Sequence, residues 1–155
     1  MTAVAQRLAE LGLSLPPVAA PVAAYVPAVV DGDLVWTSGQ LPFVDGVLPA
    51  TGLVGEGEGL VPPQDAAQLA RLCALNALAA IGSVVDLERV TRIVKVVGFV
   101  ASAPGFTGQP GVVNGASELF GDVLGEAGRH ARSAVGVAQL PLGAPVEVEV
   151  VASLR

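Results

Sequence analysis

The stretch HARSAVGVAQLPLGAPVEVEVVAS, residues 130–153, decides the fold of this chain. It contains two apolar runs, 132–139 and 145–153, whose β-branched valines are typical of strands. Residues 140–144 separate the two runs and supply the proline and the glycine that favour a turn. We therefore predict two consecutive C-terminal strands, and we consider a pairing of the two with each other around this turn.

The second of these runs alternates in a way that defines two faces of a sheet, because successive side chains of a strand point to opposite sides. One face would carry Val146, Val148 and Val150, and the other would carry Glu147, Glu149 and Val151. The valine face suits a core that is covered by helices. The glutamate face adjoins small residues of the other run, so it is either hydrated or paired with another subunit.

Two main helices and three further strands are predicted upstream of this stretch. The helices cover 64–81 and 110–126, and the strands cover 25–30, 34–38 and 91–100. The first two strands flank Asp31-Gly32-Asp33, which is a hairpin signal. The resulting order, β-β-α-β-α-β-β, predicts an α+β two-layer sandwich with both helices on one face of a mixed or antiparallel sheet.

Residues 1–155 are expected to form a single domain, and two segments lie outside this pattern. Residues 1–24 comprise a predicted helix over 2–12 and a proline-rich extension. Residues 45–63 form a glycine-rich insertion that we expect to be a solvated loop, with at most a short strand. Four prolines interrupt the uncharged run 11–30, and they would break a spanning helix, so no membrane partner is expected.

The composition limits the classes of partner and of chemistry. Apolar residues make up 52% of the chain and charged residues only 14%, which is too few to cover a monomer and therefore favours an oligomer. The net charge of −6 argues against nucleic acid, whose phosphates require clustered cations. A single histidine and a single cysteine supply no metal cluster, and no cofactor motif is present, so neither a metal nor a cofactor is expected.

The expected location is the cytoplasm. The N-terminal residues show no basic region followed by an apolar segment and a cleavage site, so no export signal is identified. Cys73 has no second cysteine with which to form an internal disulfide, and such usage is typical of a reducing compartment.

The polar residues that could carry chemistry lie near the ends of the predicted strands and helices. They are Tyr25, Ser38, Gly39, Asn114, Arg132 and Glu147. The planar guanidinium of Arg132 can bind a carboxylate through two parallel hydrogen bonds. The alternative is a structural ion pair with Glu147 or Glu149. Glu147 is open to the same two interpretations, as a general base on a partly desolvated face or as the partner of that arginine.

Several segments resemble motifs of the RidA/YjgF family. Arg132-Ser, then Leu140-Pro, then Val146-Glu-Val-Glu resembles the C-terminal signature of the family. Three further segments are similar to its first hairpin and its two helices, namely Thr37-Ser-Gly-Gln-Leu-Pro, Leu75-Asn-Ala-Leu and Val113-Asn-Gly-Ala. The matches fall in order from about Tyr25 to the C-terminus, and the N-terminal helix and the insertion resemble a longer, less well characterised branch.

The resemblance implies a chorismate-mutase-like fold that assembles as a homotrimer, with the sheets forming a central barrel and with clefts between subunits. It also implies hydrolysis of 2-imino acids or their enamine tautomers to 2-oxo acids and ammonia, without a cofactor. Arg132 would hold the substrate carboxylate and Glu147 would orient or deprotonate water. The remaining pocket residues would be Tyr25, Ser38, Gly39, Asn114 and Ala134, the last of which replaces a cysteine of better-known members.

Two other functions stay open on the sequence alone. One is a non-catalytic module that binds a small carboxylate-bearing metabolite in the same clefts, and the other is an endoribonuclease, which the acidic charge disfavours. If the last two strands pair with each other, Arg132 lies opposite about Ala152 and Glu147 lies opposite about Val137. The two side chains would then be roughly 17 Å apart, so a site that uses both is expected between two chains.

Overall fold

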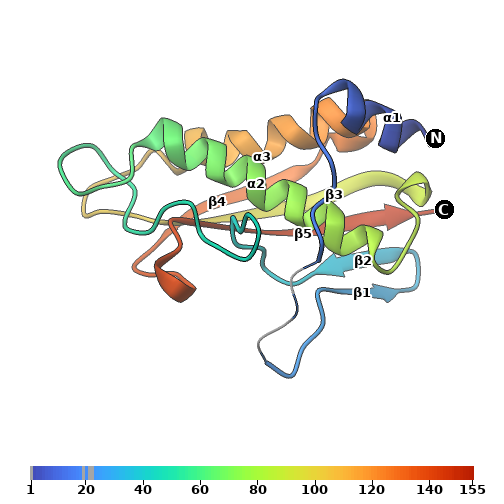
Figure 1. The fold of residues 1–155 in the computed structure, drawn as a ribbon, viewed down its shortest axis with the longest axis horizontal. Coiled ribbons are helices and arrows are strands. Elements are labelled where there is room, and N and C mark those ends of the chain that lie inside the picture. The colour runs from blue at the N-terminus through green and yellow to red at the C-terminus, as the bar shows by residue number, and fades with distance from the viewer. Residues whose placement is uncertain (1, 19, 21–22) are drawn as a thin grey trace.

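A five-stranded mixed sheet, in the order β1-β2-β5-β3-β4, forms one layer of the computed structural model, which describes residues 2–18, 20 and 23–155. The strands are β1 (Ala28–Asp31), β2 (Leu34–Thr37), β3 (Val90–Ala101), β4 (Ala131–Val137) and β5 (Val146–Leu154). The helices are α1 (Ala3–Glu10), α2 (Pro63–Gly82) and α3 (Gln109–Leu124). Figure 1 shows α2 and α3 side by side over the sheet. The predicted α+β two-layer sandwich is confirmed.

The C-terminal strands β4 and β5 do not pair with each other, so that pairing was wrong. Strand β3 lies between them, antiparallel to β5 and parallel to β4. The reason is the helical connection from β3 through α3 to β4, because a helical crossover places the two strands that it joins parallel. Figure 1 shows α3 running above β3 and β4.

This order changes the separation between Arg132 and Glu147. Arg132 pairs with Val96 of β3, whereas Glu147 pairs with Phe99 of the same strand. The two residues are therefore three positions apart along β3, about 10 Å, and two strand spacings of about 4.8 Å apart across the sheet.

The two residues also belong to opposite faces of the sheet. In β5 the residues Val146, Val148, Val150, Ala152 and Leu154 are buried beneath the helices, and the intervening residues are half-buried. This confirms the two predicted faces and places Glu147 on the face without helices. Arg132 shares its row with buried Val96, and its side chain contacts α3. Paired residues in neighbouring strands point to the same side of a sheet, so Arg132 lies on the helix-covered face.

The N-terminal and inserted segments follow the prediction in part. α1 is shorter than predicted and is capped by the Thr2 hydroxyl, which accepts from the Ala5 N–H. Residues 56–59 are exposed, as expected of a solvated loop. Val54 differs, because it is buried and extends the sheet: its N–H donates to the Ala101 oxygen and its own oxygen accepts from the Ala103 N–H. Within the described residues, no helix has both the length and the apolar character needed to cross a membrane.

A glycine sets how closely α3 approaches α2. A Cβ atom built at Gly115 would overlap the backbone oxygen of Ala67 in α2, so only glycine allows the two helices to touch at this point. Asn114 and Ser117 lie on either side of this contact along α3, and both bond Arg132. The close approach of the helices therefore fixes the height of these two side chains above strand β4.

We predict that Gly115→Ala destabilises the chain by about 1–3 kcal/mol, because the backbone of Ala67 cannot move aside as a flexible side chain would. The matched control is Gly121→Ala in the same helix, where a Cβ would meet nothing within 4 Å. That variant should gain up to about 1 kcal/mol, since alanine is the better helix former. Thermal unfolding of both variants measures the difference. Equal stabilities would show that the helices do not depend on this contact.

Candidate functional site

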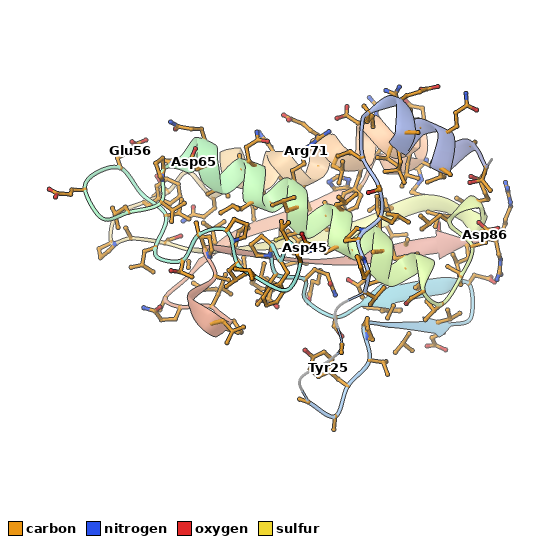
Figure 2. All side chains as sticks on the ribbon, in the orientation of Figure 1. Tyr25, Asp45, Glu56, Asp65, Arg71 and Asp86 are labelled. Carbon is orange, nitrogen blue, oxygen red and sulfur yellow. The ribbon has the colours of Figure 1, made fainter. Side chains whose placement is uncertain are left out.

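A cavity of about 340 Å³ opens beside Glu147. Three of the predicted site residues, Tyr25, Gly39 and Glu147, line this cavity. The rest of its wall includes Pro27, Gln40, Leu41, Phe43, Pro141 and Leu142. Figure 2 shows Tyr25 on the segment that leads into β1. Tyr25 was expected within the first strand, but that strand begins only at Ala28, so the side chain lies on irregular chain at the rim.

The backbone around Gly39 makes room for the carboxylate of Glu147. The pairing of β2 with β5 is interrupted between Trp36, which faces Val151, and Gln40, which bridges to Val148. This leaves one additional residue on the β2 side, which is the geometry of a β-bulge. A Cβ atom at Gly39 would overlap the Oε1 atom of Glu147. The glycine is therefore required so that the carboxylate can lie against the backbone.

Ser38 does not line this cavity. Its hydroxyl donates to the Val26 oxygen at 2.6 Å, and its N–H donates to the Pro27 oxygen at 2.8 Å. These two bonds tie the segment that carries Tyr25 to the end of β2. In the single chain, Ser38 thus holds the wall of the cavity in place, and the hydrogen of its hydroxyl is donated to Val26.

Glu147 is a half-buried carboxyl without a cation beside it. No ion pair to Glu147 is formed by any of the described residues. Burial raises the pKa of Glu147 above its ordinary value, and the negative charge of Glu149 raises it further. A carboxyl group of this kind can exchange protons with water closer to neutral pH than a solvated glutamate can.

Arg132 is bound by neutral acceptors on the other face of the sheet. One terminal nitrogen donates to Asn114 Oδ1 at 2.8 Å and to Ser117 Oγ at 3.2 Å, and the other donates to the Pro110 oxygen at 3.3 Å. Within the described part of the chain the guanidinium forms no ion pair. The ion pair with Glu147 or Glu149, considered above as the alternative, is therefore not formed within this chain. The positive charge remains available to an anion.

Two residues that support Arg132, namely Ser117 directly and His130 through Ser117, were not predicted from the sequence to do so. His130 lies 2.8 Å from Ser117 Oγ through Nε2, and its Nδ1 lies 2.7 Å from the Gly128 oxygen. Because a carbonyl oxygen only accepts, Nδ1 carries the hydrogen of that bond. Asn114 and Ser117 are three residues apart and so share one face of α3, a spacing that could have indicated the pair.

Asn76 of α2 holds the wall of the Glu147 cavity. Its side-chain amide donates to the Leu41 oxygen at 2.9 Å and to the Phe43 oxygen at 3.2 Å. These bonds satisfy a polar side chain on a partly buried side of α2. Asn76 is thus a positioning residue for the segment after β2.

The predicted site residues therefore fall into two groups within one chain. Tyr25, Gly39 and Glu147 surround the cavity on the open face. Arg132, Asn114 and Ala134 lie on the helix-covered side at the edge strand β4, where Ala134 pairs with Gly98. Arg132 is not among the residues that line the Glu147 cavity. Among the residues described, no group of three or more histidine, cysteine or acidic side chains is arranged to hold a metal ion.

Comparison with known proteins finds one family model and one relative that match nearly the whole chain. The family model described as "YjgF/chorismate_mutase-like, putative endoribonuclease" matches residues 5–154. The protein TCP17 of Trypanosoma cruzi is 47% identical over 153 residues, which cover 98% of this chain and 94% of TCP17.

Solved structures agree with this match. One is Atu1372 of Agrobacterium tumefaciens, a protein of unknown function that is 43% identical to this chain. It superimposes with a TM-score of 0.89, and the match covers 99% of this chain and 93% of the Atu1372 chain. TdcF of E. coli, solved with bound serine, superimposes with a TM-score of 0.61 at 25% identity, covering 91% and 94% of the two chains.

The raised pKa of Glu147 leads to a prediction about stability. The folded chain keeps the proton to a higher pH than the unfolded chain, so stability falls as the pH rises through the window between the two pKa values. Glu147→Gln removes the buried charge, and we expect its Tm to exceed that of the wild type by a few degrees at pH 7. The gain should shrink as the pH falls through the raised pKa of the folded chain, and it should vanish below about 4.3, the ordinary carboxyl pKa of the unfolded chain.

The control for this measurement is Glu126→Gln. Its carboxyl is 85% exposed and pairs only with the exposed Arg129. Its Tm should therefore follow that of the wild type at every pH. If Glu147→Gln showed no gain at neutral pH, the carboxylate would not be destabilised by its surroundings.

Proposed function

The chain belongs to the YjgF/chorismate-mutase-like family, and from this membership we propose that it hydrolyses 2-imino acids or their enamine tautomers to 2-oxo acids and ammonia. One observation carries the proposal: Arg132 has no acidic partner within the described chain, and Glu147 has no basic one. A substrate with a carboxylate beside an electrophilic carbon needs both of these groups. The chemistry needs no cofactor, because an imine carbon is already electrophilic.

Arg132 is the group that binds the substrate. Its terminal nitrogens form a planar fork that fits a carboxylate through two hydrogen bonds. The bonds to Asn114 and Ser117 limit the rotation of this fork before the substrate arrives. Binding then places the imine carbon at a fixed distance from the guanidinium, and such positioning lowers the barrier to attack by water.

Glu147 is the general base and acid. As the water oxygen adds to the imine carbon, the electron pair of the C=N bond moves to nitrogen and a water proton moves to the Glu147 carboxylate. Glu147 then returns this proton to the nitrogen and gives a carbinolamine. In the second step the hydroxyl proton passes to the nitrogen by the same carboxylate, the C–N bond breaks, and the 2-oxo acid and ammonia leave. The raised pKa of Glu147 suits a group that accepts and releases a proton near neutral pH.

The site is completed by a second copy of the chain. In the single chain, Arg132 and Glu147 lie on opposite faces of the sheet and about three residues and two strands apart. The face without helices carries large apolar side chains that are half exposed, including Val29, Trp36 and Val135. A patch of this kind favours association. We propose a trimer in which the sheets form a central barrel and Arg132 of one subunit faces the Glu147 cavity of its neighbour.

A second candidate function is binding of a small carboxylate-bearing metabolite without turnover. One observation favours it, namely that the related E. coli TdcF holds serine, which has a carboxylate but no imine. Stabilisation by 2-oxo acids that depends on Arg132, without any ammonia release, would support this function over hydrolysis.

Cleavage of RNA, which the family description names, fits the composition of this chain poorly. The net charge is −6, and the single lysine, Lys95, donates to Ser133 on the open face of the sheet. Phosphate backbones are bound mainly by clustered cations. The guanidinium of Arg132, which has no acidic partner among the described residues, is instead matched to a small anion.

We expect Arg132→Ala to lower kcat/KM for freshly generated 2-iminopropanoate by about 100-fold, because losing one partner of a charged pair costs about 2–5 kcal/mol. The control is Arg129→Ala, which removes an exposed arginine three positions earlier whose only ion pair is exposed. That variant should match the wild type. Ammonia release by wild-type protein no faster than in buffer would contradict the proposal.

A mixing experiment tests whether the site lies between chains. Arg132→Ala and Glu147→Gln should each be nearly inactive alone. When they are co-expressed in equal amounts, every mixed trimer keeps one boundary with an intact arginine and an intact glutamate, so about a quarter of the wild-type activity should return. Differently tagged subunits allow the mixed trimers to be isolated. If they were inactive, the two residues would not act across a boundary.

A further inference from the structure

His130 connects the turn after α3 to the guanidinium of Arg132. Its Nε2 atom lies 2.8 Å from Ser117 Oγ, and that same oxygen accepts a hydrogen bond from the Arg132 guanidinium at 3.2 Å. A single hydroxyl therefore separates the imidazole from the cation to which the proposed function assigns the substrate carboxylate.

The imidazole ring is held on two sides. It is nearly perpendicular to the buried ring of Phe120, with 6.0 Å between the two centroids. Its Nδ1 atom donates to the Gly128 oxygen at 2.7 Å. Gly128 lies against the end of α3, because a Cβ atom there would overlap the backbone oxygen of Phe120. The end of α3 thus fixes the place from which His130 reaches Ser117.

The hydrogen on Nδ1 decides the direction of the Ser117 hydroxyl. In the neutral ring Nε2 can then only accept, so Ser117 donates its one hydrogen to His130. The lone pairs of Oγ are left to accept from Arg132. A serine hydroxyl in a helix can otherwise donate to a backbone oxygen of the preceding turn. Without Nε2 as its acceptor, Oγ would no longer be fixed relative to the guanidinium.

We infer that His130 is a positioning residue for substrate binding, because it fixes the Ser117 hydroxyl and thereby the orientation in which Arg132 meets the carboxylate. This inference rests on the proposed function, which takes Arg132 as the group that binds the carboxylate. Asn114 and the Pro110 oxygen still hold the guanidinium when the link to Ser117 is lost. We therefore expect the loss to raise KM and to leave kcat nearly unchanged, as when uniform binding is removed.

Two substitutions of His130 separate this role from a structural one. His130→Asn keeps an amide that can donate to the Gly128 oxygen, but it ends short of Ser117. Its KM for freshly generated 2-iminopropanoate should rise about fivefold, the effect of one hydrogen bond, with kcat within about twofold of the wild type. His130→Gln carries an amide oxygen that reaches the position of Nε2 and can accept from Ser117. Its KM should stay within about twofold of the wild type.

Ser117→Ala removes the same link from the side of α3 and leaves the bond between His130 and Gly128 in place. It should raise KM as much as His130→Asn does. The double variant should raise KM no further, because both changes break one chain of hydrogen bonds. Equal KM for His130→Asn and the wild type, equal KM for the two His130 variants, or a further rise in the double variant would overturn the inference.

A measurement without turnover separates this inference from the proposed function. The Kd of pyruvate, measured by titration calorimetry, should follow the same order, with the wild type and His130→Gln binding more tightly than His130→Asn and Ser117→Ala. If no imine were hydrolysed but this order held, the catalytic proposal would fail and the role of His130 would stand. If the wild type hydrolysed the imine and all four proteins had the same Kd and KM, the role of His130 would fail alone.

Discussion

The parallel pairing of β3 with β4 is the constraint on which the site depends. It aligns Arg132 with Val96 and so turns the guanidinium toward α3, where Asn114 and Ser117 receive it. The same central strand pairs with β5 on its other side and directs Glu147 to the face without helices. The registers of these two pairings therefore place the two chemical groups on two different surfaces of the sheet.

Local patterns predicted the elements well, and the strand order less well. The alternation in 146–153 identified the buried and open faces of β5, because burial follows the two-residue period of a strand. The position of β3 between β4 and β5 depends on contacts between residues far apart in sequence, which no local pattern contains. Similarly, Val54 lies in a glycine-rich segment, and its burial follows only from the backbone bonds to Ala101 and Ala103.

The candidate site was predictable as a set of residues, and much less so as an arrangement. Arg132 and Glu147 stand out because a chain with only 14% charged residues places them in apolar strands. The supporting residues were harder to recognise. Ser117 and Asn76 are ordinary polar residues on helices, and their roles appear only when the acceptor or donor from a distant segment is known. Ser38 illustrates the reverse case, since its hydroxyl is already used by Val26.

Among the described residues, Arg132 and Glu147 have no partners of opposite charge, which lowers the stability of the fold. Because this arrangement costs stability, it indicates that the two groups serve a function. Burial raises the pKa of Glu147, so its ionised form weakens the fold near neutral pH. A Cβ atom at Gly39 would overlap the carboxylate of Glu147, so this position needs a glycine. Arg132 is held by three neutral oxygens, which orient a cation without neutralising it. At both positions a charged group lacks a partner of opposite charge among the described residues, and exceptions of this kind concentrate where function requires them. In the proposed function, the substrate carboxylate and the neighbouring subunit would supply the opposite charges that the described residues of this chain do not.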